Sequence, residues 1–131
     1  MVVLHIETHE RVQFVDVTGQ VAREVATSGV RRGAALVYVP HTTAGVTINE
    51  NADPSVRRDL QYALERLVPA DLPFSHREGN ADAHVKASLV GSSVVIPVEH
   101  GSLALGTWQG IFFAEFDGPR RRRLVVRMLN D

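Results

Sequence analysis

The sequence contains no cysteine among its 131 residues. Disulfides, thiolate metal sites and a cysteine nucleophile are therefore excluded, so a bound metal would need His, Asp or Glu ligands. No apolar run approaches the ~20 residues that span a bilayer. The first residues, MVVLHIETHE, also lack the basic region and long apolar segment of a secretion signal. We expect a cytoplasmic protein with no membrane partner.

An excess of either charge is also lacking. Fourteen Lys and Arg residues are balanced by 15 Asp and Glu residues, which gives a formal net charge of -1. Proteins that bind nucleic acid usually carry a basic excess that neutralises phosphates, so we expect no nucleic-acid partner. The chain length and its 44% of apolar residues are typical of one globular core. The prediction is a single domain over residues 1–131.

The first part of the chain shows short alternating patterns and one helical pattern. Residues 2–8 and 12–17 predict two strands joined as a hairpin. Apolar residues then recur at helical spacing from Thr18 to Ser28, and Gly29 supplies the left-handed residue that often ends a helix. The continuous apolar run at 34–39 indicates a strand covered on both faces.

The second part contains a strand at 46–51 and two further helices. Asp53 and Pro54 are typical first residues of a helix, which we expect to continue to Leu67. Residues 69–81 predict a loop of functional length, and Asp82 is expected to cap a helix that ends at Val90. Further strands are expected at 94–98, 103–109, 111–116 and 124–129, with a hairpin turn at 117–119. The fold class is therefore α+β, with about three helices and a folded, mixed but largely antiparallel sheet.

Three of the six histidines lie in polar segments. His41 and His76 are in loops and His84 is in the first turn of a helix, where free amides and the helix dipole also favour an anion. Three imidazoles and a water are a common zinc shell with an open position. Their spacing matches no short metal motif, so three separate loop histidines are the alternative.

Three carboxylates are candidates for acid or base chemistry. Glu115 lies in a strand that is apolar on both faces, so we expect it to be buried beside a cation, a metal or another subunit. An arginine across an interface is the structural alternative. Glu50 and Glu78 have no equally good structural role.

The segment GSLALGTWQG, residues 101–110, contains the only tryptophan. Trp108 and Gln109 offer a stacking face and an amide for a flat heteroaromatic ligand, although packing in a core or an interface is the commoner role of a lone tryptophan. The basic run Arg120 to Arg123 is interpreted as a charged hairpin tip that protects a strand edge, with phosphate binding as the alternative.

Three segments together resemble one known family. They are HTTAGVTINENADP at 41–54, HREGNADAHVKASLVG at 76–91, and GTWQG at 106–110 followed by Glu115. In this order they resemble the YjbQ family of secondary thiamine-phosphate synthases. The resemblance implies a compact homotrimer with polar residues in a cleft near the subunit boundaries. It implies a metal site at His41, His76 and His84. The polar residues beside them are candidate ligand contacts: Thr42, Thr43, Asn51, Asn80, Trp108 and Gln109.

The activity implied by the resemblance joins hydroxymethylpyrimidine diphosphate to thiazole phosphate and releases pyrophosphate. The expected cofactor is a divalent metal, which is zinc if histidines hold it and magnesium if a diphosphate substrate does. The expected partner is a phosphorylated small molecule. Two alternatives stay open on the same residues: a zinc-dependent hydrolase, and a trimer that binds a metabolite or metal without turnover.

Overall fold

The computed structural model describes residues 1–130, which form three helices and eight strands. The helices are α1 (Thr18–Ser28), α2 (Pro54–Leu67) and α3 (Ala81–Val90). The strands are β1 (Val2–Glu7), β2 (Gln13–Asp16), β3 (Gly33–Tyr38), β4 (Ala44–Glu50), β5 (Ser93–Glu99), β6 (Ser102–Leu103), β7 (Gln109–Glu115) and β8 (Arg121–Asn130). The predicted α+β class with three helices is confirmed.

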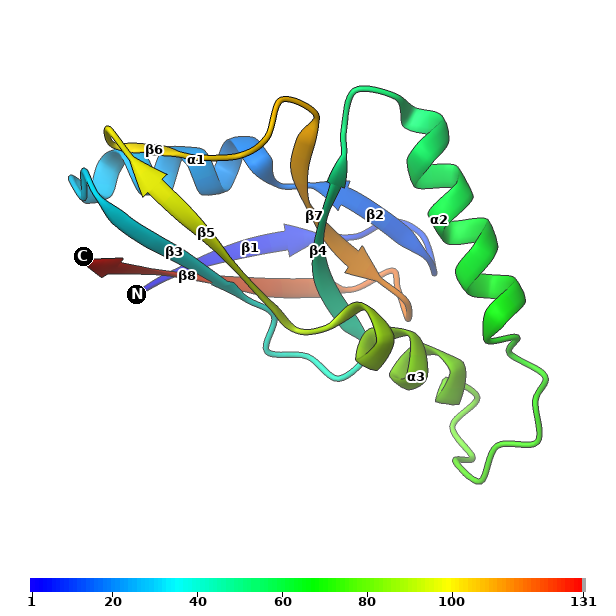
Figure 1. Ribbon diagram of the computed structural model, residues 1–131. Coiled ribbons are helices and arrows are strands. Elements are labelled where there is room, and N and C mark those ends of the chain that lie inside the picture. Colours follow the sequence, from blue (N-terminus) through cyan, green and yellow to red (C-terminus); the bar gives the residue numbers. More distant parts are fainter. Residues whose placement is uncertain (131) are drawn as a thin grey trace.

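The strands are divided between two sheets (Figure 1). Sheet A has the order β1-β8-β3-β5-β6, and sheet B has the order β2-β7-β4. All of the strand pairs among residues 1–130 are antiparallel. Within residues 1–130, no helix is long and apolar enough to cross a membrane.

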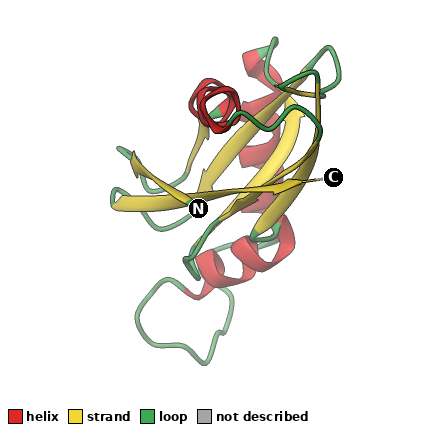
Figure 2. Ribbon diagram, turned by 90° about the vertical axis from the view of Figure 1, so that its left-hand side faces the viewer, coloured by secondary structure: helices red, strands yellow, loops and turns green. Residues whose placement is uncertain are grey.

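The main core lies between the two sheets. It combines the inward side chains of both sheets with Val21 and Val25 of α1. Figure 2 shows the helix α1 end-on beside the strands. A smaller cluster lies on the other face of sheet B, where Phe112 and Phe116 pack against Ala83 and Ala87 of α3. This second cluster explains why β7 is apolar on both faces, because it is the middle strand of a sheet covered on both sides.

Helix α2 is attached more loosely than the other helices. Its Leu60 and Leu64 pack against the second cluster, but none of its residues is fully buried. Its start follows the prediction: Asp53 Oδ1 accepts a hydrogen bond of 2.9 Å from the Ser55 amide, and Pro54 is the first helical residue. Local capping chemistry therefore defines this helix, and tertiary packing contributes less.

Both predicted hairpins are wrong. β1 pairs with β8 and β2 with β7, so residues 8–12 carry the chain from sheet A to sheet B. In the same way, residues 116–120 connect β7 of sheet B to β8 of sheet A. A turn between two alternating segments does not distinguish a hairpin from a crossing between stacked sheets, because the alternation is the same in both.

Two local predictions also need correction. The strand expected at 103–109 is reduced to Ser102–Leu103, since the following residues form a turn before β7. Asp82 does not cap α3, because Asn80 holds the N-cap position and makes no side-chain cap hydrogen bond. The carboxylate of Asp82 is instead buried, and it accepts hydrogen bonds from Lys86 at 2.9 Å and Arg11 at 3.0 Å. Burial alone would raise the pKa of Asp82, but these two cations outweigh it and lower the pKa.

The close approach of β4 to the end of α3 gives the first prediction. A Cβ added at Gly45 would lie 2.5 Å from the Gly91 carbonyl oxygen, whereas a Cβ at Gly19 in α1 meets nothing within 4 Å. We expect Gly45→Ala to destabilise the protein by about 1–3 kcal/mol through overpacking. Gly19→Ala, the matched control, should stabilise it by about 0.5–1 kcal/mol. Urea unfolding measures both, and equal effects of one sign would contradict the packing account.

Candidate functional site

A polar pocket of about 380 Å³ lies where the 40–43 loop, the start of α3 and the segment after β7 meet. We call it the candidate pocket. Its lining residues are Pro40, His41, Thr42, Thr43, Glu78, Asn80, His84, Asp117, Arg120 and Arg122. The lining residues come from three separate chain segments, and six of them, from the first two segments, were predicted from the sequence as site residues. The lower part of Figure 1 shows α3 beside the β3–β4 connection at this point.

The imidazole of His41 is fixed against β8. Its Nε2 accepts a hydrogen bond of 2.9 Å from the Arg123 amide, so the proton of the neutral ring is on Nδ1. Burial lowers the pKa of His41, and the charges of Arg122 and Arg123 lower it further against the smaller effect of Glu115. His41 is therefore held as a neutral ring with one fixed acceptor nitrogen.

A buried ion pair forms the floor of the candidate pocket. Glu115 is fully buried, as predicted, and its partner is Arg122 of the same chain. Arg122 donates from Nε to Glu115 Oε1 at 2.9 Å and from Nη2 to the other carboxylate oxygen. The same Nη2 also contacts Thr43 Oγ1 at 2.9 Å, and Thr8 donates to Glu115 Oε1 at 2.7 Å.

This network decides the protonation of Glu115. Burial would raise the pKa of the carboxyl group, but the hydrogen bonds from Arg122, Thr8 and the Asp117 amide and the charge of Arg122 together lower it. Glu115 is therefore ionised at neutral pH. The interpretation of residues 120–123 as a charged tip is wrong for Arg122, which is almost fully buried.

A second set of polar contacts joins the start of α3 to the β7–β8 connection. Asn80 Nδ2 donates to Asp117 Oδ2 at 2.9 Å, and Arg120 Nη2 donates to the same oxygen at 3.1 Å. Asp117, Arg120 and Arg122 were not among the predicted site residues. The sequence feature that could have indicated them is the dense run of charges in EFDGPRRRR, at the end of the buried strand β7.

His76 and His84 are neighbours beside the candidate pocket. Their ring centroids are 5.2 Å apart at an edge-to-face angle of 83°. They line a separate, mainly apolar pocket of about 380 Å³ with Phe74, Ser75, Ala81 and Val85, which we call the Phe74 pocket. His84 belongs to both pockets, and it also lines, together with His41, an adjoining hollow near Ser88. His41 does not line the Phe74 pocket.

The three histidines do not form a metal site within one described chain. Among residues 1–130, no three His, Asp or Glu side chains lie close enough together to hold a metal ion. His41 also has its Nε2 occupied by the Arg123 amide. A three-histidine zinc shell therefore does not fit this arrangement without ligands from outside the chain, and no chemical step below depends on zinc.

The remaining predicted residues lie at the other end of sheet B. The register pairs Ala44 with Glu115 at one end of the sheet and Glu50 with Gln109 at the other. Six residues of strand separate the two ends, a distance of about 20 Å. Asn51 and Trp108 adjoin the second end through a 3.0 Å hydrogen bond between the Asn51 amide and the Trp108 carbonyl. Trp108 is 62% exposed, so it is not part of the core of its own chain.

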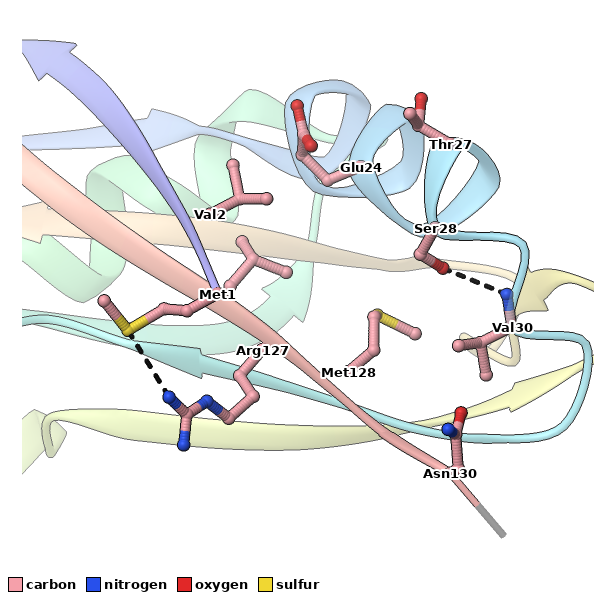
Figure 3. A pocket seen from close by; sticks show the side chains of 10 residues that line it. Met1, Val2, Glu24, Thr27, Ser28, Val30, Arg127, Met128 and Asn130 are labelled. Atoms are coloured by element: carbon pink, nitrogen blue, oxygen red, sulfur yellow. Dashed lines mark hydrogen bonds between the residues drawn. The ribbon is translucent and has the colours of Figure 1, made fainter.

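A further hollow of about 490 Å³ lies between α1, the start of β1 and the end of β8 (Figure 3). Its wall includes Met1, Val2 and Met128, and its charged groups are Glu24 and Arg127. None of the predicted site residues lines it. The polar chemistry of the described chain is concentrated at the candidate pocket instead.

The fold and the pocket define a class of two-sheet α+β proteins with a polar pocket at the start of the third helix. A family model described as "UPF0047 protein YjbQ-like" matches residues 2–131. The chain therefore belongs to the YjbQ family.

Curated relatives and solved structures cover nearly the whole chain. UPF0047 protein MJ1081 of Methanocaldococcus jannaschii is 54% identical over 126 residues, which are 96% of this chain and 91% of the relative. UPF0047 protein YugU of Bacillus subtilis is 48% identical over 96% of both chains. A crystal structure of a YjbQ/UPF0047 protein from Clostridium acetobutylicum has a TM-score of 0.97 at 50% identity, covering 98% of this chain and 100% of that one. A YbjQ-like protein of unknown function from Sulfolobus solfataricus has a TM-score of 0.95 at 33% identity, covering 98% of this chain and 95% of that one.

The environment of His41 gives the second prediction. Because burial and two arginines favour its neutral form, its pKa should lie below the usual value of about 6.5. A histidine whose pKa is lower in the folded state contributes stability that is complete above its pKa in the unfolded state. This contribution is lost as the pH falls toward its pKa in the folded state. An NMR titration of the imidazole should therefore show a midpoint below that of a short reference peptide. A midpoint at or above the reference would contradict this environment.

The buried ion pair gives the third prediction. Glu115→Gln leaves the charge of Arg122 buried without its partner, so we expect a loss of about 3 kcal/mol in the free energy of unfolding. Glu7→Gln, which removes the exposed partner of Arg121, should cost less than about 0.5 kcal/mol.

Denaturant unfolding at several pH values measures this effect. Since folding lowers the pKa of Glu115, its contribution to the free energy of unfolding is complete above the ordinary Glu pKa. That contribution is lost as the pH falls through the pKa of Glu115 in the folded state. The difference between the wild type and Glu115→Gln should therefore shrink in acid. A constant difference, or one that matches Glu7→Gln, would show that the pair contributes no such stability.

Proposed function

We propose that this chain is a homotrimeric enzyme that binds a phosphorylated small molecule in the candidate pocket. We further propose that its activities include a secondary thiamine-phosphate synthase reaction. The carrying observation is the convergence of His41, His84, Arg120 and the uncapped start of α3 on one pocket. Each of these groups can donate to or attract the oxygens of a phosphate.

The start of α3 supplies donors of a particular kind. The side chain of Asn80 makes no cap hydrogen bond, and the Asn80 carbonyl accepts from the amides of Ala83 and His84 at 3.0 and 3.4 Å. The two preceding amides, of Ala81 and Asp82, are the first-turn donors that this carbonyl does not engage. The side chain of Arg120 is about half exposed, and its guanidinium forms an ion pair with Asp117, which also lines the pocket. A phosphate at this point would meet backbone amides and a guanidinium at the positive end of a helix dipole.

The acidic side of the same pocket suits magnesium better than zinc. Mg²⁺ is commonly bound by one or two carboxylates together with the phosphates of a substrate. Glu78 and Asp117 line the candidate pocket and could supply such carboxylates. Bound there, magnesium would neutralise charge on a leaving diphosphate, while Arg120 and the start of α3 would hold its oxygens.

Support for the homotrimer comes from the outer face of sheet A. The three helices pack against the core between the sheets or against sheet B, and no helix among residues 1–130 packs on this face. Apolar side chains on this face that are partly or fully exposed include Val3, Leu36, Tyr38, Val95, Val125 and Leu129. The charged residues Glu7, Arg121, Arg123 and Arg127 share the face with them. Antiparallel registers place these residues side by side across four strands. An exposed apolar patch of this kind is typical of a subunit interface.

The phosphate site gives the fourth prediction. Arg120→Gln and His84→Gln should each weaken the binding of inorganic phosphate or pyrophosphate by about tenfold, because each removes a donor to the anion. Arg121→Gln is the matched control, since Arg121 contacts Glu7 outside the pocket. Isothermal titration calorimetry measures all three variants. Equal affinities in Arg120→Gln and Arg121→Gln would refute the proposed phosphate position.

The reaction itself is tested by product analysis. The wild type is incubated with hydroxymethylpyrimidine diphosphate, thiazole phosphate and Mg²⁺, and the release of pyrophosphate and the joined product are both followed. Both products, lost together in Arg120→Gln, support the proposal. Cleavage of a phosphoester without a joined product would favour a hydrolase. Phosphate binding with no turnover would favour a binding protein.

A further inference from the structure

The polar residues that the sequence singles out are divided between two ends of sheet B. One end carries the candidate pocket and the Phe74 pocket, and the other carries Glu50, Trp108 and Gln109. About 20 Å of strand separates them within one chain, so Trp108 cannot reach the pockets of its own chain. In Figure 1 the connection before β7 is at the top of the molecule and α3 is at the bottom.

The turn that carries Trp108 is held in a defined shape. The Gln109 amide donates to the Gly106 carbonyl at 3.1 Å, and the Gly106 amide donates to Gln109 Oε1 at 2.8 Å. The Asn51 amide fixes the Trp108 carbonyl at 3.0 Å. These contacts hold the backbone on both sides of an indole that is 62% exposed. A large aromatic side chain on a fixed backbone loses little freedom on binding, which is why tryptophan is common among the central residues of protein interfaces.

The Phe74 pocket has the properties of an acceptor for such a ring. It has a volume of about 380 Å³ and is lined by Phe74, Val85 and Ala81, with the imidazoles of His76 and His84 at its side. Aromatic and imidazole rings stabilise an indole through edge-to-face contact. Glu50 lies at the same end of the sheet as Trp108, and the segment after His76 carries one charge of each sign, Arg77 and Glu78.

We propose that Trp108 of one copy inserts into the Phe74 pocket of the next copy. The proposal rests on the homotrimer of the proposed function. The donor turn and the acceptor pocket are different surfaces, so the contact is head-to-tail, and three such contacts close into a ring. It places Gln109 and Glu50 of one copy beside the candidate pocket of its neighbour. Each phosphate site is then completed by the adjacent copy.

The single tryptophan allows a direct test by fluorescence. In the assembled wild type, Trp108 emission should be blue-shifted from that of the urea-unfolded chain, and its acrylamide quenching constant should be several-fold lower. Val85→Arg places a charge in the acceptor pocket and should shift the emission to the red and restore quenching. Leu89→Arg is the matched control, one helical turn away on α3 and outside the pocket, and it should leave the emission unchanged.

Cross-linking tests the same contact without depending on Val85→Arg folding well. The chain has no cysteine, so Thr107→Cys combined with Val85→Cys introduces one reactive group at each surface. A short bismaleimide should convert this double variant into covalent dimers and trimers. Each single variant should remain uncross-linked, because a head-to-tail contact never brings two identical positions together. Thr107→Cys with Thr27→Cys on α1 is the control pair.

The outcomes separate this inference from the function proposed above. An assembled protein that binds phosphate but whose Trp108 is quenched as freely as in the unfolded chain would overturn the inference alone. Cross-linking of the single variants, or of the control pair to the same extent, would overturn it as well. A shielded Trp108 with the expected cross-links, but without phosphate binding, would support the ring and reject the phosphate site. A monomer in sedimentation velocity would reject both the trimer and the inserted tryptophan.

Discussion

The ion pair between Glu115 and Arg122 joins the two sheets at the point where the chain crosses from one to the other. Glu115 ends β7 of sheet B, and Arg122 is the second residue of β8 in sheet A. Thr8 and Thr43 complete the hydrogen bonds of the pair, and each belongs to a loop that also leaves one of the sheets. The hydrogen bonds to Glu115 and the charge of Arg122 offset the cost of burying this carboxylate, and together they lower its pKa. The relative position of the sheets is therefore coupled to the electrostatics of the pocket floor.

The candidate pocket is built on top of this pair. His41 is placed by the amide of Arg123, one residue beyond Arg122, and Asp117 is two residues beyond Glu115. Asp117 in turn accepts hydrogen bonds from Asn80 at the start of α3 and from Arg120. The side chains that line the pocket are thus fixed by hydrogen bonds to one another and to the ion pair, an arrangement suited to keeping donors in place without a bound molecule.

Local rules in the sequence predicted most of the elements. The Asp53-Pro54 start of α2, the left-handed Gly29 after α1 and the doubly apolar β7 each have one physical cause within a few residues, and the structure agrees with all three. The burial of Glu115 followed from the same reasoning. Strand pairing could not be predicted this way, because the alternation of β1 and β2 is identical in a hairpin and in a crossing between two stacked sheets.

The site was predicted only in part for a related reason. The histidines and the residues of the 41–43 loop were recognised from their types, but the distances between them depend on how the sheets stack. Sequence spacing could not show that Glu50 and Trp108 lie a full strand length from His41. The role of Arg122 was also hidden, because a run of four arginines is typical of a solvated surface, and only the register of β8 determines which of them points inward.

Helix α2 has no fully buried residue, and this has a consequence for how the molecule opens. The free energy needed to separate one element from a fold scales with the apolar surface that the element shares with the rest. For α2 this surface is limited to Leu60, Leu64 and their immediate contacts. By this measure α2 is the helix that needs the least free energy to separate from the two sheets. Insertions and proteolytic cuts would be tolerated best in this part of the chain.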